Sequence, residues 1–98
     1  MNSTKINQEN AEPIAEIMKA VAHPLRLRII DLLCNGDARV TDMAERLGAK
    51  QALVSQQLRI LRMSNLVETK KENGVSRYTL AEPRLSDLIE CVVGCKRK

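Results

Sequence analysis

Residues 49–63 read AKQALVSQQLRILRM, and this stretch decides the fold. With about 100° of rotation per residue it predicts a helix of about four turns whose side chains divide into two arcs. The inner arc is apolar apart from one amide and consists of Leu53, Val54, Gln57, Leu58, Ile60 and Leu61. The outer arc has no carboxylate and consists of Gln51, Ala52, Ser55, Gln56, Arg59 and Arg62. Such amides, hydroxyls and guanidinium groups read base edges and hold phosphates in duplex DNA, and an ordinary solvated face is the alternative interpretation.

The segment before this helix completes a helix-turn-helix. Apolar residues at helical spacing mark a short helix closed by Gly48, namely Val40, Met43, Ala44 and Leu47. Two helices joined by a turn of three or four residues that contains Gly match this motif. Its second helix enters the major groove, and its N-terminal half meets the bases. That half holds Lys50, Gln51, Ala52, Ser55 and Gln56.

The segment after it changes to a period of two. Asn73-Gly74 is a strong two-residue hairpin turn. Folding about this turn pairs Val67 with Leu80 and Thr69 with Tyr78 on one face, and Glu68 with Thr79 and Lys70 with Arg77 on the other. Lys70, Lys71 and Arg77 make the hairpin basic, which is typical of a wing that contacts phosphates or the minor groove. The alternative is a solvated hairpin whose lysines protect its edges.

Apolar spacing predicts three further helices. The first runs from Pro13 to about Ala22, the second from Pro24 to about Cys34, and the last begins at Pro83. The second is apolar on more than one side and should lie centrally. The first and last helices have apolar stripes left over, so we expect them to form a homodimer surface. Residues 1–12 are interpreted as a flexible arm, and residues 13–98 as a single domain.

Composition narrows the class of partner. The chain has 98 residues, a net charge of +4 and a single aromatic residue, Tyr78. The charge suits a polyanion, and the lack of aromatic residues argues against stacking on RNA or single strands. No apolar run is long enough for a membrane span, and the polar first twelve residues lack a signal-peptide core, so we expect a cytoplasmic protein. One histidine offers no positioned base for a thiolate nucleophile, so we expect no enzyme. We also expect no required cofactor.

The order helix, helix, helix-turn-helix, basic hairpin, helix resembles the ArsR/SmtB family of winged-helix repressors. The matching motifs are AHPLRL at 22–27, VSQQL at 54–58, LV at 66–67 and RYTL at 77–80, although many relatives carry His where Gln57 stands. The resemblance implies a homodimer on a pseudo-palindromic operator, released when an inducer binds. It places Gln51, Ala52, Ser55 and Gln56 at base edges, and Lys50, Arg59, Lys70, Lys71 and Arg77 on the DNA backbone.

The sequence lacks the ligands of two inducer sites known in the family. One site known in the family is a Cys-x-Cys pair at the start of the third helix, where residues 39–43 hold no thiol. Another uses Asp and His on the last helix, which has Asp87 and Glu90 but no histidine. Three thiols remain as sensor candidates, Cys34, Cys91 and Cys95.

Two inducer chemistries fit these thiols. Cys91 and Cys95 lie at i and i+4 on one side of the last helix. Thiolates select soft species, and pyramidal arsenic(III) or antimony(III) takes three sulfurs. Sulfur- and redox-sensing relatives pair a second-helix Cys with one on the last helix, although their second-helix position falls near Asp31. A reactive sulfur species is therefore the other inducer, and plain core packing is the structural alternative. The alternative function is a protein-interaction module with structural cysteines and no DNA binding.

Overall fold

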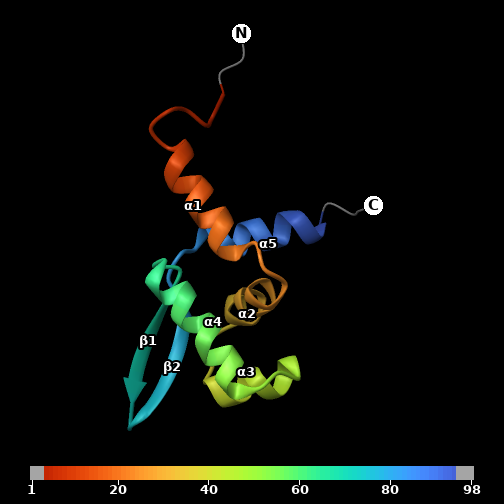
Figure 1. The fold of residues 1–98 in the computed structure, drawn as a ribbon, viewed down its shortest axis with the longest axis vertical. Helices are drawn as coiled ribbons and strands as arrows, with labels where there is room; N and C mark the ends of the chain where they lie inside the picture. The colour runs from red at the N-terminus through yellow and green to blue at the C-terminus, as the bar shows by residue number, and fades with distance from the viewer. Residues whose placement is uncertain (1–3, 95–98) are drawn as a thin grey trace.

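The computed structural model describes residues 4–94 and confirms the predicted winged helix-turn-helix, mainly α-helical with one β-hairpin (Figure 1). The elements in chain order are α1 (Ala11–Val21), α2 (Pro24–Cys34), α3 (Val40–Leu47), α4 (Gln51–Met63), β1 (Val67–Glu72), β2 (Val75–Leu80) and α5 (Arg84–Gly94). In Figure 1 the hairpin extends away from the end of the molecule where α1 and α5 lie. No helix within residues 4–94 is long and apolar enough to cross a lipid bilayer.

Helix α2 lies at the centre of the fold, as its apolar composition predicted. It packs against α1, α3, α4, α5 and β2. Ile29 and Ile30 of α2 are completely inaccessible to solvent, and so are Met43 of α3 and Leu58 of α4. The core is therefore built from aliphatic side chains and methionine, and its α4 contribution fixes which side of that helix faces outward.

Local signals in the sequence set the helix ends. His23 precedes α2, and its Nδ1 accepts a hydrogen bond from the backbone N–H of Leu25 at 3.1 Å, while Pro24 occupies the first turn. Gly48 closes α3 with φ of 64°, a left-handed conformation that costs other residues more. The backbone N–H of Ala49 then bonds to the carbonyl of Ala44 at 3.0 Å, which makes the turn into α4 tight.

Three helix boundaries differ from the prediction. Helix α1 begins at Ala11, two residues inside the predicted arm, because the turn before it is already hydrogen-bonded. The Asn7 and Asn10 side chains each accept the other's backbone N–H, at 3.0 and 2.8 Å. Helix α4 begins at Gln51 rather than at residue 49, since the preceding residues form the turn. Helix α5 begins at Arg84, one residue after Pro83.

The hairpin has the predicted register. Val67 pairs with Leu80, Glu68 with Thr79, Thr69 with Tyr78 and Lys70 with Arg77. Asn73 and Gly74 both have positive φ, 53° and 79°, as a tight two-residue turn of the I′ type requires. A contact that the sequence did not predict joins the hairpin to the helices. Tyr78 and Ala38 exchange backbone hydrogen bonds of 2.8 and 3.1 Å, which attaches β2 to the loop before α3.

The start of α5 leads to a prediction about pH. The Glu82 carboxylate accepts hydrogen bonds from Nε of Arg84 at 2.7 Å and from its backbone N–H at 3.2 Å. These bonds lower the pKa of Glu82 from 4.5 to about 2. A carboxyl with a depressed folded pKa contributes stability above its unfolded pKa, and this contribution is lost as the pH falls through the folded value. Glu82 therefore stabilises the start of α5 at neutral pH and loses this effect between about pH 4.5 and pH 2.

We expect Glu82→Gln to melt below the parent protein at neutral pH, because the amide cannot form the charged pair with Arg84. The difference between the two melting temperatures should shrink as the pH falls towards about 2, where half of the parent carboxylate is protonated. Thermal unfolding followed by circular dichroism across this range measures the difference. A constant difference at all pH values would contradict this role for Glu82.

Candidate nucleic-acid interface

Helix α4 is held by a narrower apolar arc than the sequence predicted. The buried residues of this helix are Val54, Gln57, Leu58 and Leu61. Leu53 was expected in the same arc but is 42% exposed. At about 100° per residue Leu53 and Ile60 both lie on one flank of the buried arc, roughly 90–110° from its centre, and the core covers Ile60 only in part and leaves Leu53 exposed.

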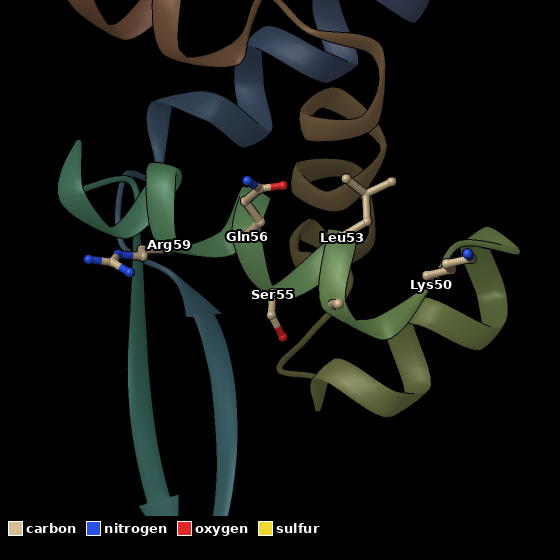
Figure 2. Close-up of a pocket in the computed structure, with 6 residues that line it drawn as sticks. Lys50, Leu53, Ser55, Gln56 and Arg59 are labelled. Atoms are coloured by element: carbon tan, nitrogen blue, oxygen red, sulfur yellow. The ribbon is translucent and has the colours of Figure 1, made fainter.

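The outer side of α4 is exposed as predicted. All six residues predicted for this side are exposed to solvent, namely Gln51, Ala52, Ser55, Gln56, Arg59 and Arg62. A shallow groove runs along this side and is lined by Lys50, Ala52, Leu53, Ser55, Gln56 and Arg59. Figure 2 shows Lys50 and Arg59 at opposite ends of the groove, with Ser55 and Gln56 between them. The lining contains no carboxylate, so the groove offers polar donors and positive charge to whatever lies on it.

The hairpin adds further positive charge beside α4. Lys70 and Lys71 are exposed and Arg77 is half-buried. Lys70 and Arg77 occupy directly opposed positions in the two strands. Like charges placed opposite one another repel in a hairpin, and Glu68 and Glu72 on the same face of β1 offset part of this repulsion. A bound anion would relieve the repulsion.

A side-chain contact that the sequence did not reveal links the hairpin to α4. Nη1 of Arg62 donates a hydrogen bond to Oγ1 of Thr69 at 3.3 Å. Because Arg62 lies in the last turn of α4 and Thr69 in β1, the contact sets the hairpin against that end of the helix. The helix and the basic hairpin therefore lie next to each other (Figure 1).

The sensor candidates lie on different faces. Cys34 is half-buried at the end of α2 and Cys91 is exposed on α5, whereas Cys95 lies outside the described residues. Cys34 lines a groove with Asp31, Asn35, Ser86, Ile89, Glu90, Val93 and Gly94. Cys91 is not part of this groove and points about 140° away from it around α5, at about 100° per residue. Within residues 4–94 no group of three His, Cys, Asp or Glu side chains could hold a metal ion.

An apolar groove crosses α1, α2 and α5, the region where leftover apolar stripes were predicted. It is lined by Met18, Val21, Ala22, Leu27, Arg28, Asp31, Leu88, Ile89, Val92 and Val93. Met18 is 50% exposed, Val92 65% and Val93 56%. Exposed apolar side chains gathered on one face mark an interaction surface rather than a solvated one. We call this set the α1/α2/α5 groove.

Proteins similar to this chain are named as regulators of transcription. A family model described as "Bacterial regulatory protein, arsR family" matches residues 23–69. The transcriptional regulator NmtR of Mycobacterium tuberculosis is 35% identical over 88 residues, covering 90% of this chain and 73% of that protein. The crystal structure of the transcriptional repressor BigR from Xylella fastidiosa superimposes with a TM-score of 0.85 at 28% identity, covering 93% of each chain.

A solution structure of Mb0332 from Mycobacterium bovis, described as a homodimeric winged helix-turn-helix DNA-binding domain, superimposes with a TM-score of 0.77. It is 27% identical and the match covers 95% of this chain and 89% of that one. These relatives are named as regulators of transcription, which act by binding rather than by catalysis.

Proposed function

The chain belongs to the ArsR/SmtB family of DNA-binding transcriptional repressors, and from this premise we propose that it binds a specific duplex operator as a homodimer and releases it when thiol chemistry changes its shape. The carboxylate-free groove on α4, next to a hairpin with two opposed cations, is the observation that carries the DNA-binding part. The α4 groove presents amide, hydroxyl and positive groups without a carboxylate, which is the set of groups that meets phosphates and base edges in duplex DNA.

The residues divide into two roles on DNA. Gln51, Ala52, Ser55 and Gln56 lie in the first half of α4, which enters the major groove in this motif, and they meet base edges. A Gln side chain can bond adenine at two atoms, and a methyl group can contact the methyl of thymine. Lys50, Arg59, Lys70, Lys71 and Arg77 supply the positive charge that holds phosphates.

Substitutions separate these two roles. We expect Arg59→Ala and Lys71→Ala each to weaken binding to all duplex sequences and to reduce the salt dependence of affinity by about one unit of log–log slope per lost phosphate contact. Gln51→Ala should instead reduce discrimination among sites, by about 1–3 kcal/mol at one base pair. Gel-shift titrations at several salt concentrations measure both effects.

Lys19→Ala is the matched control for these variants. Lys19 is an exposed basic residue of α1, paired with Glu16 at 3.4 Å, and it lies on neither α4 nor the hairpin. Its removal should leave DNA affinity unchanged. If Arg59→Ala, Lys71→Ala and Gln51→Ala also bind as the parent does, the alternative of a protein-interaction module without DNA binding replaces this proposal.

The homodimer forms through the α1/α2/α5 groove. The groove is almost wholly apolar, and its most exposed members lie on the terminal helices. A second copy seated on it would cover side chains that a single copy leaves in water, at about 25 cal/mol per Å² of apolar area. A symmetric dimer also presents two copies of α4, as a pseudo-palindromic operator requires.

The inducer acts through the cysteines, and the geometry favours a site between subunits. Cys34 and Cys91 lie on different faces of one subunit, so a three-sulfur site for arsenic(III) or antimony(III) would combine thiols from both copies. A reactive sulfur species requires only that two of the thiols approach each other. Either change at α2 and α5 would alter the dimer surface that holds the two α4 helices in place.

A titration distinguishes these chemistries. The operator complex is treated with arsenite, antimonite, zinc, hydrogen peroxide and a persulfide donor, and DNA release is followed by fluorescence anisotropy. We expect DNA release either by arsenite and antimonite or by the persulfide donor. We expect no release from a variant in which Cys34, Cys91 and Cys95 are all Ser. If that variant releases DNA as the parent does, the cysteines have only a packing role.

A further inference from the structure

Arg26 connects three helices through one guanidinium group. It lies in the first turn of α2, where its Nε donates a hydrogen bond to Oε1 of Gln57 on α4 at 2.9 Å. Its Nη1 donates a second bond, also 2.9 Å, to the backbone carbonyl of Ala20 at the end of α1. A positive charge at the C-terminal end of α1 is also favourable for the helix dipole. The same side chain therefore fixes α4 relative to α1 as well as to α2.

Gln57 is an unusual residue for its position. Within residues 4–94 it is the one polar side chain among the buried residues, with 8% of its surface exposed. It lies in the apolar arc of α4 beside Val54, Leu58 and Leu61. An aliphatic residue would pack there without needing any partner, whereas a buried amide must be hydrogen-bonded to be tolerated. Stability alone does not explain an amide here, but a bond that selects one geometry does.

The two hydrogen bonds of Arg26 connect the outer groove of α4, which we propose to bind DNA, with the α1/α2/α5 groove, which we propose to form the dimer. Gln57 is flanked along α4 by Gln56, which lines the outer groove. Ala20 is followed by Val21 and Ala22, which line the α1/α2/α5 groove. We propose that Arg26 is a positioning residue for DNA recognition. Through Gln57 it sets the rotation of α4 about its own axis, with the end of α1 as the fixed point. This inference rests on the proposed DNA binding.

The test compares two substitutions of similar size at Gln57. Gln57→Glu keeps an acceptor oxygen for Arg26, and Gln57→Leu removes the acceptor while fitting the apolar arc. We expect Gln57→Leu to fold and to remain a dimer, with a loss of stability of no more than about 1–3 kcal/mol, since Nε of Arg26 loses its acceptor while Leu fits the apolar arc. Its affinity for the specific operator should fall by about tenfold or more, a coupling in the range of contacting residues. Gln57→Glu should bind the specific operator with an affinity close to that of the parent.

A second readout separates positioning from a general loss of structure. Affinity for non-specific duplex DNA depends on the phosphate contacts of the hairpin and of Lys50 and Arg59 on α4, and the substitutions at Gln57 leave all of these flexible basic side chains in place. We expect it to be unchanged in Gln57→Leu, so that only the ratio of specific to non-specific affinity falls. Arg26→Met should cause the same loss, and the Arg26→Met, Gln57→Leu double variant should be no weaker than the weaker single variant. Lys19→Met is the control for the removal of a positive charge.

Two outcomes would overturn the inference while DNA binding stands. One is operator affinity in Gln57→Leu equal to that of the parent, and the other is losses in Arg26→Met and Gln57→Leu that multiply in the double variant. If Arg26→Met does not fold, the Gln57→Leu and Gln57→Glu pair decides the matter alone. Failure of the parent itself to discriminate any duplex sequence would instead overturn the proposed function.

Discussion

Leu58→Ala should lower the free energy of unfolding by about 2–5 kcal/mol, because it empties space in the centre of the core. Leu58 is completely inaccessible to solvent and lies in the buried arc of α4. A domain of this size has a total stability of about 5–15 kcal/mol, so the variant loses a large share of it. Each kcal/mol corresponds to about 4–8 °C in melting temperature for a domain of 60–100 residues.

Leu53→Ala is the matched control, since it removes the same atoms from the same helix at a position that is 42% exposed. We expect a change within about 0.5 kcal/mol, as for most surface substitutions. Urea unfolding of both variants measures the difference. Equal destabilisation by the two substitutions would mean that Leu53 is covered in the folded protein, as the helical pattern alone had suggested.

The comparison of Leu53 with Leu58 shows how far sequence periodicity reaches. The spacing of apolar residues predicted every helix and identified the outer side of α4, because a helix must bury one side in a core of this size. It did not predict the width of the buried arc, which depends on what the neighbouring helices cover. The hairpin register followed from Asn73-Gly74 because a two-residue turn leaves one way to pair the strands.

The sequence pattern did not predict contacts between segments that lie far apart along the chain. Arg26 and Gln57 are separated by 31 positions, and neither local spacing nor charge indicates that they meet. The presence of an amide in an otherwise apolar arc was the one available signal. The bridge from Ala38 to Tyr78 likewise depends on how α3 is placed after the loop. The sequence predicted which side chains lie in the candidate site. It did not predict which residues of the other helices contact that site, because those contacts depend on the packing of the helices.

The position of Cys34 relative to the cysteines of α5 could not be predicted from the sequence either. The spacing of Cys91 and Cys95 predicts that they share a side of α5, and nothing in the spacing relates that side to Cys34. The structure places Cys34 in a groove with Glu90 and Val93, on a face of α5 that Cys91 does not share. In the proposed sensor, the way in which two subunits meet would therefore decide which thiols combine.

Val92→Glu should abolish the homodimer while leaving each subunit folded. Val92 is 65% exposed on α5 and lines the α1/α2/α5 groove, so a carboxylate there is hydrated in a single copy. In the dimer it would be buried in a groove whose lining is mostly apolar, and desolvation of the carboxylate there costs several kcal/mol. We expect the dimer dissociation constant to rise by about 100-fold or more, since each 1.4 kcal/mol is about tenfold.

The effect on DNA follows from the loss of the second binding unit. Two linked copies of α4 bind a two-part operator about 10²–10⁴ times more tightly than one copy can. Sedimentation equilibrium and operator titration of the same preparation measure both quantities. Met63→Glu is the control, because Met63 is 75% exposed at the end of α4 and lies outside the groove, so this variant should remain a dimer. A dimeric Val92→Glu would show that the subunits meet elsewhere, and the intersubunit thiol site would then lose its basis as well.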